Sequence, residues 1–241
     1  MVVSRKKMGA PGVFSVRWCR PDQGLERSLA PYMPTDSLMR IVTQFHWPRK
    51  LGGHPMGRFA PNEFLYCGPI AHALLTDPAF RHWFLQETKF ADCARAAVPL
   101  TAEHASCRTT PNSQKWFWFN CFCPLDRSCL CRIETGIETD ILLIFAAPDR
   151  PRFAVHIEVK RPGENFNPGQ AESYPRRARC WATDSTRPST VPRHHDFVTV
   201  AVCDERAKAD PRSRAFDDVV LHADIAKKIA PYPDITDARL D

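Results

Sequence analysis

The chain has 241 residues, of which 44% are hydrophobic and 25% are charged, and its net charge is +6 at pH 7. This length supports one large domain with its own core, and the composition excludes a disordered tail, a collagen and a coiled coil. No apolar run reaches the roughly 20 residues that span a bilayer, and no apolar stretch follows the charged N-terminus, so we expect no membrane span and no secretory signal. The ten cysteines are then expected in a reducing compartment, the cytoplasm, as thiols, metal ligands or core residues.

Helices are expected in the first part of the chain. Residues 1–33 are expected to form a basic, irregular N-terminal arm, and a single domain is expected over 34–241. A first helix is expected from Asp36, which is a favourable N-cap residue. A second helix is expected near Asn62, and we expect Gly68-Pro69 to kink or split it.

A third helix is expected from Pro78, with Asp77 as its N-cap. After residue 114 the hydrophobic pattern becomes typical of strands. Strands are expected over 115–123, 129–135, 137–145, 152–160 and 197–203. One helix is expected within 169–182, and another over 217–229, where Val219-Val220-Leu221 also fits a strand.

Acidic and basic side chains come together on two of these strands. Glu138 and Asp140 share a face of one strand, and Glu158 and Lys160 share a face of the next, because side chains alternate along a strand. A four-residue turn joins the strands, so they can pair as neighbours. Clustered carboxylates raise one another's pKa, and a divalent cation relieves this repulsion. Oxygen ligands favour Mg²⁺ or Mn²⁺ over Zn²⁺.

This arrangement resembles the PD-(D/E)xK nuclease superfamily, in which an Asp on one strand is followed by Glu-x-Lys on the next. Here the pattern is Asp140 and Glu158-Val159-Lys160, and Thr139 stands in place of the proline that names the superfamily. The resemblance implies that Asp140, Glu158 and the Val159 carbonyl bind the metal and that Lys160 positions the attacking water. It also implies an α/β fold: a restriction-endonuclease-like core with a central mixed sheet flanked by helices, plus an N-terminal helical extension.

A second motif adds to the resemblance. Gln170-Ala171-Glu172-Ser173-Tyr174 is similar to the Gln-x-x-x-Tyr motif of RecB-like and lambda-exonuclease-like branches, and the resemblance implies that Gln170 and Tyr174 face the site. On a helix these two side chains share a face, but Pro175 follows directly, so either the helix is kinked or it starts after Gln170. Glu63 is the candidate for the acidic residue that the superfamily carries on an early helix. The resemblance covers residues 62–203 in element order.

Basic residues are concentrated in one part of the chain. Residues 150–193 contain nine Lys or Arg and four Asp or Glu, a local excess of +5. Such an excess suits a polyanion, and a solvated basic face is the alternative. After the Gln-x-x-x-Tyr motif, Arg176, Arg177 and Arg179 are candidates for contact with a nucleic-acid backbone, together with Arg161.

Four cysteines flank a predicted turn over 124–128. In a hairpin, Cys121, Cys123, Cys129 and Cys131 would share one face and could bind Zn²⁺ as a structural ion. Cys-x-Cys is a poorer ligand spacing than Cys-x-x-Cys, so apolar packing of the four thiols is the favoured interpretation. Disulfide-bonded pairs of these cysteines are a third interpretation.

Together these features predict an enzyme that hydrolyses phosphodiester bonds, with Mg²⁺ or Mn²⁺ as cofactor and DNA as the nucleic-acid partner. A homodimer is an option, because double-strand cutting by such domains often needs two copies. The alternatives are a relative of these nucleases that binds nucleic acid without cutting, and an interaction protein built on a zinc hairpin.

Overall fold

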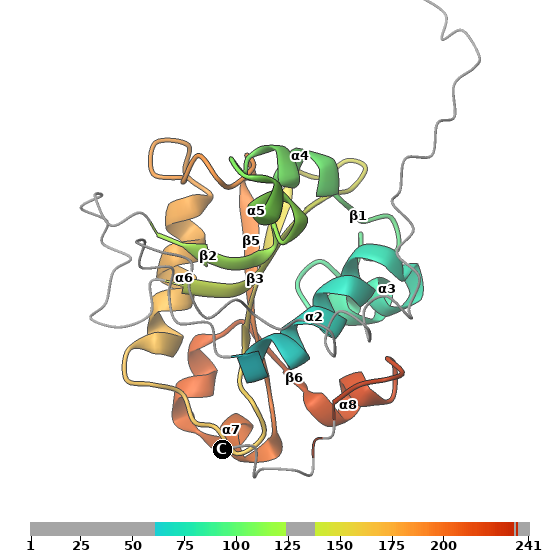
Figure 1. Cartoon of the computed structure of the whole chain (residues 1–241), viewed down its shortest axis with the longest axis vertical. Coiled ribbons are helices and arrows are strands. Elements are labelled where there is room, and N and C mark those ends of the chain that lie inside the picture. The colour runs from blue at the N-terminus through green and yellow to red at the C-terminus, as the bar shows by residue number, and fades with distance from the viewer. Residues whose placement is uncertain (1–60, 124–137, 234, 236–241) are drawn as a thin grey trace, which may run out of the picture. The chain divides into compact units, whose positions relative to one another are not determined.

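The computed structural model describes residues 61–123, 138–233 and 235. All of them belong to one compact unit, Leu51–Asp241. The expected N-terminal arm, the helix from Asp36 and the strand over 129–135 lie outside the described residues. Within the described part the fold is α/β, with a mixed sheet flanked by helices (Figure 1).

Six strands form one sheet in the described part of the chain. They are β1 (Val98–Pro99), β2 (Phe119–Phe122), β3 (Glu138–Ala146), β4 (Phe153–Val159), β5 (Asp196–Cys203) and β6 (Asp218–Leu221). The order is β1-β3-β4-β5-β6, and β2 also pairs with β3. Strand β3 is antiparallel to β1, β2 and β4, whereas β4, β5 and β6 are parallel. The predicted antiparallel pairing of β3 with β4 is confirmed.

Helices cover both faces of this sheet (Figure 1). They are α2 (Pro61–Thr76), α3 (Pro78–Gln86), α4 (Thr101–Ser106), α5 (Pro111–Lys115), α6 (Gln170–Trp181), α7 (Glu205–Ala209) and α8 (His222–Ala226), with a 3₁₀ turn at Pro211–Ala215. Helices α2 and α3 pack against the face that carries Ile141 and Val155. Trp181 of α6 packs against the opposite face, beside Leu142 and Ile144. Strand β4 is therefore buried along its whole length, as is typical of a sheet covered on both sides.

Helix α2 continues through Gly68-Pro69, so the expected split into two helices is wrong. A proline clashes with the Cβ of the residue before it, and Gly68 has no Cβ. The proline still removes one backbone hydrogen bond. Complete burial of Ile70 and Leu74 against the sheet offsets that loss.

The start of α3 is confirmed, because the Asp77 carboxylate accepts the N–H groups of Ala79 and Phe80 at 2.8 and 3.1 Å.

The expectation of a single helix over 217–229 is wrong. Residues 218–221 form β6, parallel to β5, and α8 follows. The apolar residues Val219-Val220-Leu221 suit a strand, and pairing with β5 satisfies the backbone groups on one side of it.

The expected strand over 115–123 is shorter, because α5 occupies residues up to Lys115 and β2 begins at Phe119.

In the described part, no helix combines the length and the apolar character that crossing a membrane requires.

Candidate active site

The carboxylate of Asp140 lies where the two central strands stop pairing. The β3–β4 ladder ends at the pair Ile141–Ile157, although β4 continues to Val159. Beyond this pair the backbone N–H of Val159 donates to Asp140 Oδ2 at 2.7 Å. Buried backbone groups need a hydrogen-bond partner, so the acid side chain takes the place of a strand carbonyl between the two strand ends.

Glu158 and Lys160 meet Asp140 at this point. Continuing the register by one step sets Asp140 opposite Glu158. Glu158 Oε1 lies 2.9 Å from Lys160 Nζ. The exposed fractions of Asp140, Glu158 and Lys160 are only 4%, 2% and 3%. The structure therefore brings together the two acids and the lysine of the predicted motif, and it shields them from solvent.

Helix α6 begins at Gln170 and passes through Pro175, so the late start that Pro175 left open does not occur. Gln170 is the first helical residue, and its Nε2 donates to Glu158 Oε1 at 2.6 Å. Its Oε1 accepts the N–H of Asn167 at 3.1 Å. Glu158 is thus held from two sides, by an amide from α6 and by the Lys160 ammonium.

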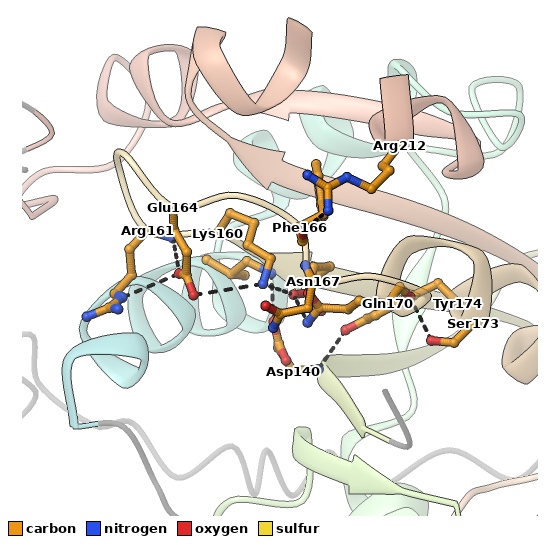
Figure 2. Close-up of polar contacts among 12 residues, drawn as sticks. Asp140, Lys160, Arg161, Glu164, Phe166, Asn167, Gln170, Ser173, Tyr174 and Arg212 are labelled. Atoms are coloured by element: carbon orange, nitrogen blue, oxygen red, sulfur yellow. Dashed lines mark hydrogen bonds and ion pairs between the residues drawn. The ribbon is translucent and has the colours of Figure 1, made fainter. Parts of the chain in front are cut away.

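Tyr174 ties the two strand ends to α6 (Figure 2). Its hydroxyl accepts the N–H of Asp140 at 3.2 Å and donates to the carbonyl of Ile157 at 3.4 Å. The residue is completely buried. Tyr174 therefore positions Asp140 from the side of the strand ends that faces α6. Because it is completely buried, it does not reach a substrate in this conformation.

Two further carboxylates belong to the group. Glu63, in the first turn of α2, interacts with the Asp140 carboxyl group. Glu138 is the first residue of β3, paired with Phe122 of β2. The early-helix glutamate that the resemblance suggested thus lies at the strand ends with the other acids.

The carboxylates oppose one another electrostatically. Burial raises the pKa of Asp140 well above its ordinary value, and the charges of Glu158 and Glu63 raise it further. Burial also raises the pKa of Glu63, again with help from Glu158. The pKa of Glu138 is raised to about 7 by burial and by the charges of Glu63 and Glu158. Burial and mutual repulsion thus both disfavour the ionised form of these three carboxyl groups.

Lys160 remains an ammonium in this setting. Burial lowers its pKa, but the charge and hydrogen bond of Glu158, together with Glu164 and Asp140, raise it by more, so the net pKa lies above the ordinary value. Lys160 is therefore a hydrogen-bond donor and a positive charge, not a base.

A loop over residues 161–169, between β4 and α6, closes over Lys160 (Figure 2). Glu164 Oε1 is 3.9 Å from Lys160 Nζ, and the centre of the Phe166 ring is 5.9 Å from it. Arg212 donates to the Phe166 carbonyl and ion-pairs with Asp210. The loop is thus fastened to the 3₁₀ turn after α7.

Arg177 is not available as a surface contact for nucleic acid. It is completely buried, and its Nε donates to Thr139 Oγ1 at 2.8 Å. Its Nη1 donates to Ser173 Oγ at 3.2 Å, and its guanidinium lies 4.4 Å from the centre of the Tyr174 ring. Arg177 lies on the buried face of α6, next to the site, where it contacts Thr139 and Tyr174.

The other predicted arginines lie nearer the surface. Arg176 and Arg179 are exposed on the outer side of α6. Arg161 is half-buried and ion-pairs with Glu164 at 3.4 Å. Arg176 and Arg179 therefore stay candidates for phosphate contacts.

Cys121 and Cys123 are buried at the end of β2, and Arg108 Nη2 lies 2.7 Å from Cys121 Sγ. Cys129 and Cys131 lie outside the described residues, so the four-cysteine hairpin stays a prediction.

His222 is a neighbour of the site that sequence reasoning missed. It is buried, and its Nε2 lies 2.6 Å from the Lys160 carbonyl oxygen. The two residues are 62 positions apart, and no local signal in the sequence connects them.

In the described part of the chain, no three His, Cys, Asp or Glu side chains stand ready as a metal-ligand set. The oxygens of Asp140 and Glu158 instead accept hydrogen bonds from Val159, Lys160 and Gln170. Comparison with protein-family models, with curated proteins and with solved structures found no match.

Proposed function

We propose that this protein is a metal-dependent nuclease that hydrolyses phosphodiester bonds in DNA and resembles the PD-(D/E)xK superfamily in its core. One observation carries the proposal: Asp140, Glu158 and Glu63 gather with the Lys160 ammonium at the ends of two adjacent strands. The order helix, strands, helix, strand over residues 61–203 supports a restriction-endonuclease-like core.

The donor set suits a hard divalent cation. Carboxylate oxygens of Asp140, Glu158 and Glu63 are the atoms that Mg²⁺ and Mn²⁺ prefer. Burial and mutual repulsion raise the pKa of Asp140 and of Glu63, and a cation would relieve this cost. Asp140, Glu158 and the Val159 carbonyl would hold the ion, which would supply positive charge against the scissile phosphate.

The chain's own groups then have separate tasks. The Lys160 ammonium donates hydrogen bonds that orient the attacking water and stabilise negative charge growing on the phosphate. Glu158 holds this ammonium at 2.9 Å, and Gln170 holds Glu158 at 2.6 Å. Tyr174 and Arg177, both on α6, hold the strand ends in place. Preorganisation of this kind limits the reorganisation needed at the moment of reaction.

Two exposed arginines on α6 suit contact with a nucleic-acid backbone. Arg176 and Arg179 are exposed on the helix that starts at Gln170, so they lie on the same element as a side chain that touches Glu158. Phosphate contacts from such arginines position a duplex without reading its sequence.

Burial of the site has a mechanistic consequence. Because Lys160 is 3% exposed beneath the loop over residues 161–169, a DNA strand reaches it only when that loop moves. The same burial favours a second candidate function, namely binding of nucleic acid without cleavage.

The test is cleavage of supercoiled plasmid and of linear DNA with Mg²⁺, Mn²⁺ or EDTA. We expect metal-dependent cutting by the wild type and a loss of about 10²–10³ in rate for Lys160→Ala, as for the removal of a donor that stabilises transition-state charge. Lys160→Gln serves as a second variant, because Lys160→Ala leaves Glu158 buried without its partner.

The matched control is Lys89→Ala. Lys89 also ion-pairs with a carboxylate, Asp196 at 2.5 Å, but the pair is exposed and lies at the opposite end of β5. Exposed pairs contribute little, so this variant should cut DNA at the wild-type rate. Absence of cutting with either metal, with DNA binding retained, would favour the non-cutting candidate.

A further inference from the structure

Beside Lys160, a histidine from the far end of the chain holds the point at which β4 becomes a loop. His222 Nε2 lies 2.6 Å from the Lys160 carbonyl oxygen, and His222 Nδ1 lies 2.8 Å from Tyr232 Oη. The imidazole is 1% exposed. Both ring nitrogens therefore have a buried or half-buried partner within hydrogen-bond distance.

The partners determine which nitrogen carries the proton. A carbonyl oxygen can only accept, so the proton lies on Nε2 and points at Lys160. Nδ1 of the neutral ring then accepts from the Tyr232 hydroxyl. Burial lowers the pKa of His222, and this outweighs the opposite effect of the Lys160 carbonyl. The neutral tautomer with Nε2–H is thus the form that this environment favours.

His222 and Tyr232 also reach the helix that carries Glu63. The Tyr66 ring on α2 lies 5.1 Å from the His222 ring and 6.1 Å from the Tyr232 ring, centre to centre. Tyr66 follows Glu63 by three positions, so the two residues are neighbours on the helix surface. The aromatic group links α2, the segment after β6 and the end of β4.

We propose that His222 is a positioning residue for the proposed nuclease reaction: it donates Nε2–H to the Lys160 carbonyl and thereby fixes the peptide that carries the lysine. The inference rests on the proposed function. The N–H of Lys160 is already held by the Val202 carbonyl at 2.8 Å. With His222 in place, the peptide groups on both sides of Lys160 are anchored just before the chain enters the loop over residues 161–169.

This anchor matters because the lysine works at the end of a strand. Loop motion is needed to admit a substrate, and without the His222 bond that motion would extend back to Lys160 and to the Val159 carbonyl. A buried carbonyl left without a donor also carries a penalty. His222 thus fixes the strand end that carries Lys160 at the point where the loop over residues 161–169 begins.

The experiment measures metal-dependent plasmid cleavage by the full chain and by three variants. His222→Ala removes the donor. His222→Gln places a side-chain amide N–H at about the reach of Nε2 and is expected to restore the bond. His194→Ala is the matched control, because His194 is equally buried and bonded to a backbone carbonyl, that of Pro192 at 2.9 Å, near the opposite end of β4.

We expect kcat to fall about tenfold in His222→Ala with KM unchanged, to recover to within about threefold of wild type in His222→Gln, and to stay at the wild-type value in His194→Ala. A purely structural role would lower the folded fraction of both alanine variants alike, which circular dichroism and thermal unfolding record. An undiminished kcat in His222→Ala beside a cleaving wild type would overturn the positioning role alone. A wild-type chain that does not cleave would overturn the proposed function and this inference with it.

Discussion

Tyr174→Phe separates a positioning tyrosine from one that touches substrate. The change removes only the hydroxyl, which accepts the Asp140 N–H at 3.2 Å and donates to the Ile157 carbonyl at 3.4 Å. The ring would keep its contacts with the Arg177 guanidinium, 4.4 Å away, and with the Phe216 ring, 5.1 Å away. The hydroxyl also interacts with the Glu158 side chain, so the variant tests all of these contacts without opening a large cavity.

The size of the effect follows from burial. Asp140 and Ile157 are 4% and 0% exposed, so water does not easily replace the lost hydroxyl. An unsatisfied buried N–H costs about 1–3 kcal/mol. We therefore expect the free energy of unfolding to fall by about 2 kcal/mol, which for a domain of this size lowers Tm by about 4–8 °C.

Urea unfolding in EDTA measures this loss, and plasmid cleavage in Mg²⁺ measures its effect on activity. We expect kcat to fall by less than about tenfold, because the hydroxyl holds Asp140 through its backbone and Glu158 through its side chain and does not meet the substrate. Two results would refute the reasoning. Unchanged stability would mean that the bonds contribute nothing, and a rate loss as large as that of Lys160→Ala at unchanged stability would mean that Tyr174 acts on the substrate.

Three further predictions concern acid, charge and metal. Burial lowers the pKa of His194 to about 4, so the unfolded chain binds a proton that the folded chain does not. About 3 kcal/mol of stability present at pH 7 should therefore be lost through this group as the pH falls from 6.5 to 4. In a urea-unfolding series, His194→Gln should lose stability less steeply than the wild type over this range. Arg177→Met should lower the free energy of unfolding by about 3 kcal/mol or more through its buried partners, whereas Arg176→Met at the exposed neighbouring position should leave it unchanged in the same assay. Mg²⁺ should raise the Tm of the wild type reversibly, and Asp140→Asn, which keeps an oxygen for the Val159 N–H, should abolish that rise; an equal rise in the variant would place the ion elsewhere.

Much of the site could be read from the sequence because its signals are local. Apolar alternation marked β3 and β4, and a short turn made them neighbours, which brings Asp140 to Glu158 and Lys160. The i, i+4 spacing set Gln170 and Tyr174 on one side of a helix, and both contact the strand ends. Each of these inferences depends on backbone geometry over a few residues.

Other features required the packed structure. The arginines at 176, 177 and 179 look alike in the sequence, and only the docking of α6 on the sheet decides that Arg177 is buried while its neighbours are exposed. The same holds for α2, which stays helical through Pro69 because its buried face is held by the sheet.

The sequence by itself determined the α/β pattern, the pairing of β3 with β4 and the acids and lysine that meet at their ends. The tertiary structure alone decided that these acids and the lysine are closed to solvent. It also decided that Tyr174 and Arg177 of α6 contact the strand ends, and that His222 holds Lys160 from 62 residues away. The physical reason is range: strand alternation, turns and caps act between near neighbours, whereas burial and long-range hydrogen bonds exist only after the helices have packed on the sheet.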